Sequence, residues 1–163
     1  MNKKNILFIA AAILFIGAGV YFSLSSPAAT STGKLEASHL NYDFGQLFME
    51  NGKVSHKFIL RNSSDQAVTL GEISTSCMCT VAYLEYNGKE IGPFGMGEMS
   101  SPGSLTVAGT TIDPGKEAVI KAVFDPAAHG PAGAGHVERV IYVDTDSQVQ
   151  PKLQLQFSAE VNL

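Results

Sequence analysis

The clearest pattern in the chain is an alternation of apolar and polar residues near its C-terminal end, in the stretch PKLQLQFSAEVNL (151–163). The apolar positions are Leu153, Leu155, Phe157, Ala159 and Val161, and polar residues stand between them. Because successive side chains of a β-strand point to opposite faces, this alternation predicts a strand with one buried and one solvated face.

Similar or weaker strand patterns occur in six further stretches, separated by Gly, Pro, Asn and Asp: 35–44, 53–62, 67–76, 80–86, 117–125 and 136–146. No stretch after residue 34 has a convincing helical period. About seven short strands without helices predict an all-β protein, an immunoglobulin-like antiparallel β-sandwich. A closed barrel is the main alternative.

Two glycine-rich stretches interrupt this pattern. Residues 87–115 hold seven glycines and three prolines, and the long connection over 87–111 also carries Met96 and Met99. A second such stretch, 125–136, carries His129 and His136. Long connections of this kind are usually functional or mobile, so both stretches are candidate sites.

The N-terminal segment differs from the rest. Residues 6–24 are nineteen residues without a charge, and Lys3 and Lys4 precede them. The length favours a single membrane-spanning anchor, and the lysines favour a cytoplasmic N-terminus. A cleaved signal peptide over residues 1–28 is the alternative. We therefore expect an anchor or signal peptide over 1–24, a linker over 25–34 and one domain over 35–163, periplasmic or extracellular, or secreted after cleavage.

Charge and compartment narrow the possible partners. The net charge is −4 and no Lys/Arg-rich patch is present, so nucleic acid is not an expected partner. An exported domain folds where disulfides form and persist.

The only two cysteines lie in TSCMCT (75–80), with one residue between them. If 77–79 is extended, both thiols face the same side. Three interpretations stay open. Cys77 and Cys79 form a disulfide, which an extended backbone would strain; they bind a soft metal such as Cu(I), together with Met96, Met99 or His129; or they are reduced and simply packed.

Several stretches together resemble a known family. They are YDFG (42–45), NGKVSHKFILRNSS (51–64), TSCMCT (75–80) and IDPGKEAVIKAVFDP (112–126). In this order they are similar to the exported bacterial proteins called domain of unknown function 1573 (DUF1573), over roughly residues 40–146. The resemblance implies an immunoglobulin-like sandwich of the sperm-protein and hydin type, which serves as a scaffolding or binding module, and it implies no enzymatic activity. Met78 departs from the family pattern, which has Gly between the cysteines, and the 87–111 connection is longer than usual.

These observations lead to three expectations about function. The first is a non-catalytic interaction module, held at the membrane by residues 6–24, with another envelope protein as its partner. The second is Cu(I) binding through Cys77 and Cys79 with loop methionines or His129; no other cofactor is expected. The third is a thiol–disulfide redox protein that uses the same two cysteines. No arrangement of residues typical of a catalytic site is recognisable in the sequence.

Overall fold

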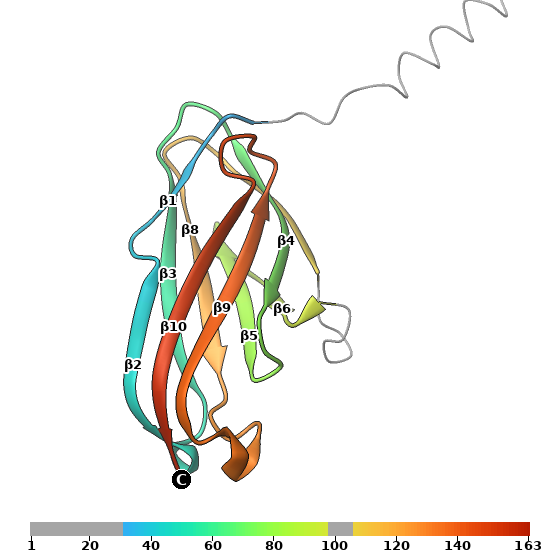
Figure 1. The fold of residues 1–163 in the computed structure, drawn as a ribbon. Helices are drawn as coiled ribbons and strands as arrows, with labels where there is room; N and C mark the ends of the chain where they lie inside the picture. Colours follow the sequence, from blue (N-terminus) through green and yellow to red (C-terminus); the bar gives the residue numbers. More distant parts are fainter. Residues whose placement is uncertain (1–30, 98–105) are drawn as a thin grey trace, which may run out of the picture.

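The computed structural model describes residues 31–97 and 106–163, and Figure 1 shows their arrangement. These residues form ten strands: β1 (Leu35–Ala37), β2 (Asn41–Phe48), β3 (Val54–Asn62), β4 (Val68–Thr75), β5 (Thr80–Tyr86), β6 (Lys89–Phe94), β7 (Val107–Ile112), β8 (Glu117–Phe124), β9 (Gly135–Thr145) and β10 (Lys152–Asn162). Two short 3-10 helices, η1 (Met49–Asn51) and η3 (Gly130–Gly133), lie in the connections.

The strands make two five-stranded sheets that pack on each other as a β-sandwich. One sheet has the order β1-β3-β8-β5-β6, and the other has the order β2-β10-β9-β4-β7. The named strand pairs are antiparallel, except that β2 runs parallel to β10. The all-β prediction is confirmed, but the sandwich is not wholly antiparallel, because the sheet that contains β2 is mixed.

The core lies between the two sheets. Every second residue of β10 is buried, as the alternation predicts, and Phe157 contacts the rings of Phe44 and Phe124 with centroids 5.3 Å away in both cases. Phe58 and Phe94 are also completely buried. Burial of one face of each strand is the main stabilising contribution to such a sandwich.

The prediction of one strand over 35–44 is wrong, because this segment divides between the sheets. β1 pairs with β3, and the amide of Ser38 still donates to the carbonyl of Ile59 (2.9 Å). The carbonyl of Leu40 already accepts from Gln156 of β10 (2.7 Å). The chain therefore crosses from one sheet to the other over three residues.

The 87–111 connection is also more regular than predicted, because it contains β6 and most of β7. Gly92 allows β6 to approach β5: a Cβ at this position would lie 2.9 Å from the Tyr83 ring and 3.0 Å from the Ala82 carbonyl oxygen. A glycine that looks like a strand breaker in the sequence is therefore required by close packing. These two strands and the divided first strand raise the count from the predicted seven to ten.

The predicted anchor over 6–24 lies outside the described residues. Within residues 31–97 and 106–163, no helix is long and apolar enough to cross a membrane. The described end of the predicted linker lies against the domain, because Ser31 is buried and forms a bridge with Ser147.

Candidate functional site

The two cysteines lie in the turn between β4 and β5, and the residues around them fix this turn. The hydroxyl of Thr75 lies 3.1 Å from the carbonyl oxygen of Cys77 and 3.0 Å from that of Thr80. The amide of Thr80 donates to the same Cys77 carbonyl (3.1 Å). The two threonines of TSCMCT therefore close the turn and satisfy its backbone oxygens.

Further hydrogen bonds fasten the turn to both sheets. The amide of Ser76 donates to the Val140 carbonyl of β9, and its hydroxyl accepts from the Val140 amide, both at 2.9 Å. The amide of Asp125, directly after β8, donates to the Cys79 carbonyl (2.9 Å). The β8–β9 loop and β9 are thereby held beside the sulfur atoms.

Cys77 and Cys79 form a disulfide, and their Cα atoms are 5.3 Å apart. The assumption of an extended backbone at 77–79 is wrong, since these residues form a bend and a turn. The turn brings the Cα atoms into the range of separations usual for disulfides. Cys79 is buried, whereas Cys77 is half-buried.

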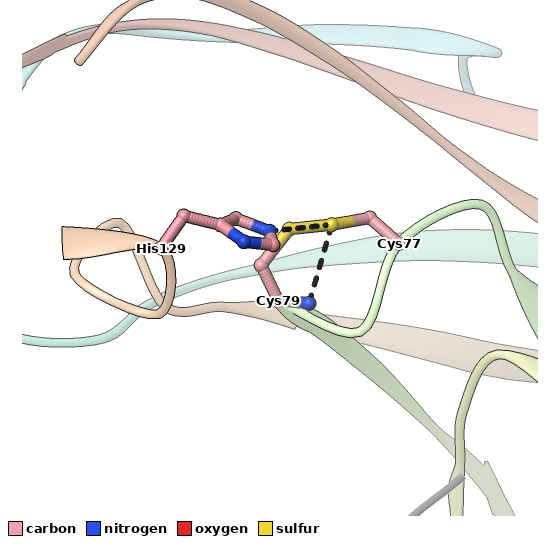
Figure 2. A group of neighbouring side chains, drawn as sticks. All are labelled: Cys77, Cys79 and His129. Atoms are coloured by element: carbon pink, nitrogen blue, oxygen red, sulfur yellow. Dashed lines mark hydrogen bonds between the residues drawn. A yellow bond between two sulfur atoms is a disulfide. The ribbon is translucent and has the colours of Figure 1, made fainter. Parts of the chain in front are cut away.

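His129 reaches the disulfide from the β8–β9 loop (Figure 2). Its Nε2 atom lies 3.2 Å from the Sγ atom of Cys77, and the Cys79 amide donates to the same sulfur (3.3 Å). Ligand atoms of Cys77, Cys79 and His129 all lie within 4.8 Å of one another. The structure therefore brings together three of the five residues that the sequence suggested for a metal site.

Sequence reasoning missed Arg139 as a site residue. Its Nε atom donates to the Sγ atom of Cys79 (3.1 Å), and its Nη1 atom donates to the Glu138 carbonyl (2.8 Å). The side chain stands on β9 at an inward-facing position, between the buried residues Val137 and Ile141. A positive charge at an apolar position was the available signal, because a cation seldom faces a core without a partner.

Of the two loop methionines suggested as ligands, the structure describes only Met96. Met96 follows Gly95, whose carbonyl accepts from the Thr75 amide (3.0 Å), so its backbone lies beside the cysteine turn. Met99 lies outside the described residues. Met78, between the cysteines, is 70% exposed, and among the described residues the only non-glycine with a positive φ is Asn87. The turn therefore has no conformational requirement for the glycine that the family pattern places at 78.

A second cluster of titratable side chains lies between β2 and β3. His56 is half-buried, stacks on Tyr42 with ring centroids 3.5 Å apart, and its Nε2 atom lies 2.7 Å from that of His39. Burial lowers the pKa of His56, and the neighbouring His39 lowers it further.

A known protein family matches the part of the chain that contains the cysteine turn. Residues 35–100 match the model described as "Protein of unknown function (DUF1573)". The resemblance to DUF1573 is confirmed for these residues. The DUF1573 match covers the cysteine turn but ends before His129 and Arg139. A search of curated proteins gave no match.

Solved structures with similar folds share little sequence with the chain. A protein of unknown function from Porphyromonas gingivalis W83 is 18% identical with a TM-score of 0.59, covering 83% of this chain and 50% of the other. A family 123 glycoside hydrolase from Clostridium perfringens is 9% identical with a TM-score of 0.52, over 82% and 28%. A PapD-like domain of human CEP192 is 15% identical with a TM-score of 0.47, over 84% and 92%. The first two likenesses support the sandwich fold alone, and the chain spans half the length of the Porphyromonas protein.

Proposed function

We propose that the protein is an exported, non-catalytic interaction module with an immunoglobulin-like sandwich, which binds another protein of the bacterial cell envelope. The observation that carries this proposal is the free edge of β2. In the part of the chain that the structure describes, β2 pairs only with β10, so its other edge is free. The edge of β3 nearby is also partly free, because β1 pairs only with the second half of β3. An unpaired strand edge offers backbone donors and acceptors to an extended segment of a partner.

The side chains along this edge suit such a partner. Leu40 is 49% exposed and Phe48 is 42% exposed, at the two ends of β2. The stack of Tyr42 on His56 joins β2 of one sheet to β3 of the other. Exposed apolar side chains beside a free edge would add contact area to backbone pairing.

Site-specific photocrosslinking in cells of the source organism tests the proposal. A crosslinker at Leu40 or Phe48 is expected to form an adduct with a defined partner. The same crosslinker at Val149, an exposed residue of the β9–β10 turn, is the control. Leu40→Asp is expected to weaken the adduct formed at Phe48. Equal adduct yields at all three positions would overturn the proposal.

The same cells test the attachment to the membrane. If residues 6–24 anchor the protein, the full-length chain stays in the membrane pellet after alkaline carbonate extraction. If residues 1–28 are a cleaved signal, a shorter protein is recovered in the soluble fraction, and its N-terminal sequence begins after the cleavage point.

A second candidate function, thiol–disulfide exchange, is favoured by the contact of Arg139 with the disulfide. The half-buried Cys77 sulfur is the one that an external thiolate can attack, and Cys79 would leave as a thiolate beside the Arg139 guanidinium. Stabilisation of the leaving thiolate promotes this step and favours the reduced form.

We take a protein dithiol as the reductant, and the electrons and protons of the exchange then balance. Its first thiolate forms a mixed disulfide with Cys77, and its second thiolate then attacks the partner sulfur of that mixed disulfide and releases Cys77. Two electrons and two protons pass to Cys77 and Cys79, and the partner becomes a disulfide.

Equilibration of the purified protein with dithiol/disulfide buffers tests this second function. Arg139→Met is expected to lower the fraction of reduced protein at a given buffer ratio by several-fold, because the thiolate loses its cation. Arg61→Met changes the other arginine of the chain, which is exposed on β3, and serves as the control. An Arg139→Met protein that is reduced as readily as the control would refute the role of Arg139.

A further inference from the structure

The disulfide and His129 make a compact set of soft and borderline metal ligands. Their three ligand atoms come from two connections, the β4–β5 turn and the β8–β9 loop, and lie within 4.8 Å of one another. Figure 2 shows the imidazole ring of His129 directed at the two sulfur atoms. In the oxidised form the sulfur lone pairs belong to a disulfide, which is a poor metal ligand compared with a thiolate.

We propose that reduction of the Cys77–Cys79 disulfide creates a Cu(I) site in which both thiolates and the His129 imidazole bind one ion. The proposal rests on the reducibility of the disulfide that thiol–disulfide exchange requires. A dithiol first reduces the disulfide to two thiols and is itself oxidised. One Cu⁺ then replaces the two thiol protons, which are released to solvent.

The distances permit this site without a change of fold. Metal–sulfur and metal–nitrogen bonds in protein sites are about 2.0–2.3 Å, so ligands of one ion lie up to ~4 Å apart. Breaking the sulfur–sulfur bond lets the two Sγ atoms separate to that distance. His129 Nε2 is already 3.2 Å from Cys77 Sγ, and the hydrogen bonds of the Thr75 hydroxyl and the Asp125 amide keep the turn in place.

Charge favours Cu(I) over a divalent ion. Two thiolates and Cu⁺ carry a net charge of −1, and the guanidinium of Arg139 contacts the Cys79 sulfur (3.1 Å). None of the ion pairs within residues 31–97 and 106–163 gives Arg139 a carboxylate partner. Arg139 would therefore neutralise a Cu(I)–dithiolate, whereas a Zn²⁺–dithiolate is already neutral.

The number of ligands fits either metal, so the charge decides between them. Structural zinc sites are almost always four-coordinate, and catalytic zinc sites use three protein ligands with water in the fourth position. The described residues supply two sulfurs and one imidazole, and thiolates bind Cu(I) and Zn²⁺ alike, so the net charge of −1 beside Arg139 is what favours Cu(I). The inferred cargo or ligand is thus a single monovalent soft cation, held only in the reduced state.

The test uses the full-length protein under anaerobic conditions, with the thiol count as its first measurement. Reduction and removal of the reductant should expose two thiols per chain. Cu(I) is then added in competition with a chromophoric Cu(I) chelator. The reduced protein is expected to bind one Cu(I) per chain and the oxidised protein none, and X-ray absorption should show two sulfurs and one nitrogen around copper.

Variants distinguish the residues that bind the metal from residues that only support the fold. His129→Gln is expected to weaken Cu(I) binding at least tenfold, and His136→Gln, an exposed histidine of the same region, to leave it unchanged. Cys77→Ser/Cys79→Ser should abolish one-to-one binding. Thermal unfolding shows whether this variant and His129→Gln are folded. If no thiols appear on reduction, exchange and copper binding both fail. If two thiols appear but His129→Gln binds like His136→Gln, or Zn²⁺ displaces copper at equal concentration, only the copper proposal fails.

Discussion

The hydrogen bonds of the Asn62 side chain allow a direct test of what stabilises the turns of the sandwich. Its side chain is completely buried at the end of β3. The Nδ2 group donates to the carbonyls of Gln66 and Ile112, both at 2.8 Å. The Oδ1 atom accepts from the amide (3.1 Å) and the hydroxyl (2.6 Å) of Ser64. One side chain thus satisfies three polar groups of the β3–β4 connection and one at the end of β7.

Asn62→Ala removes all four of these hydrogen bonds. Each buried bond contributes about 1 kcal/mol net, but the two Ser64 groups are half-exposed and can bond to water instead. The Ile112 carbonyl is buried and would be left without its partner. We therefore expect the free energy of unfolding to fall by about 3 kcal/mol, a large part of the roughly 5–15 kcal/mol typical of a domain.

Urea unfolding followed by circular dichroism measures this loss. The midpoint should move to lower urea by about 1–2 M, with an unchanged slope. Asn62→Asp should lose more, since it directs a carboxylate oxygen at two carbonyl oxygens. Asn51→Ala, at an exposed position of η1, is the control and should stay within about 0.5 kcal/mol of the parent. A loss below about 1 kcal/mol in Asn62→Ala would refute the proposed role of these bonds.

Three further predictions test the core, a close strand contact and a pH dependence. Phe157→Ala removes a ring that contacts two other rings and should lower the free energy of unfolding by about 3–5 kcal/mol in denaturant titrations; a loss near 1 kcal/mol would contradict the packing. Gly92→Ala forces a Cβ against Tyr83 at a φ of 140° and should be destabilised by about 1–3 kcal/mol, while Gly71→Ala, which has ordinary contacts, should not. His56 has a lowered pKa because of burial and a neighbouring imidazole, so the unfolded chain binds its proton more readily. Stability should therefore fall as the pH drops below about 6.5 and be insensitive to this residue above it. His56→Gln should flatten that fall between pH 7 and 5, and an unchanged profile would count against the assignment.

Alternation predicted the fold class because half-buried strands are directly visible in a sequence. Residues 151–163 show this most clearly, and β10 covers almost the same residues. β6 and β7 were missed because glycines interrupt their pattern and Val107 is exposed. The change of sheet between β1 and β2 depends on bonds to β3 and β10, which are distant in the sequence. Local pattern therefore finds strands, whereas their pairing is set by contacts that no local pattern contains.

The cysteine site divides in the same way between local and distant residues. TSCMCT contains the threonines that close its own turn, so the motif alone could identify the turn that carries the two sulfur atoms. The side chains that contact the sulfurs from outside the motif are His129 and Arg139, and Arg139 stands 60 residues from Cys79 along the chain. Both residues lie beyond the segment that matches DUF1573. The motif thus contains the hydrogen bonds of its own turn, while the proposed exchange and copper binding assign the tuning of the sulfurs to residues outside it. A protein that keeps the motif but has an apolar residue in place of Arg139 should therefore have the same turn and a disulfide that is harder to reduce.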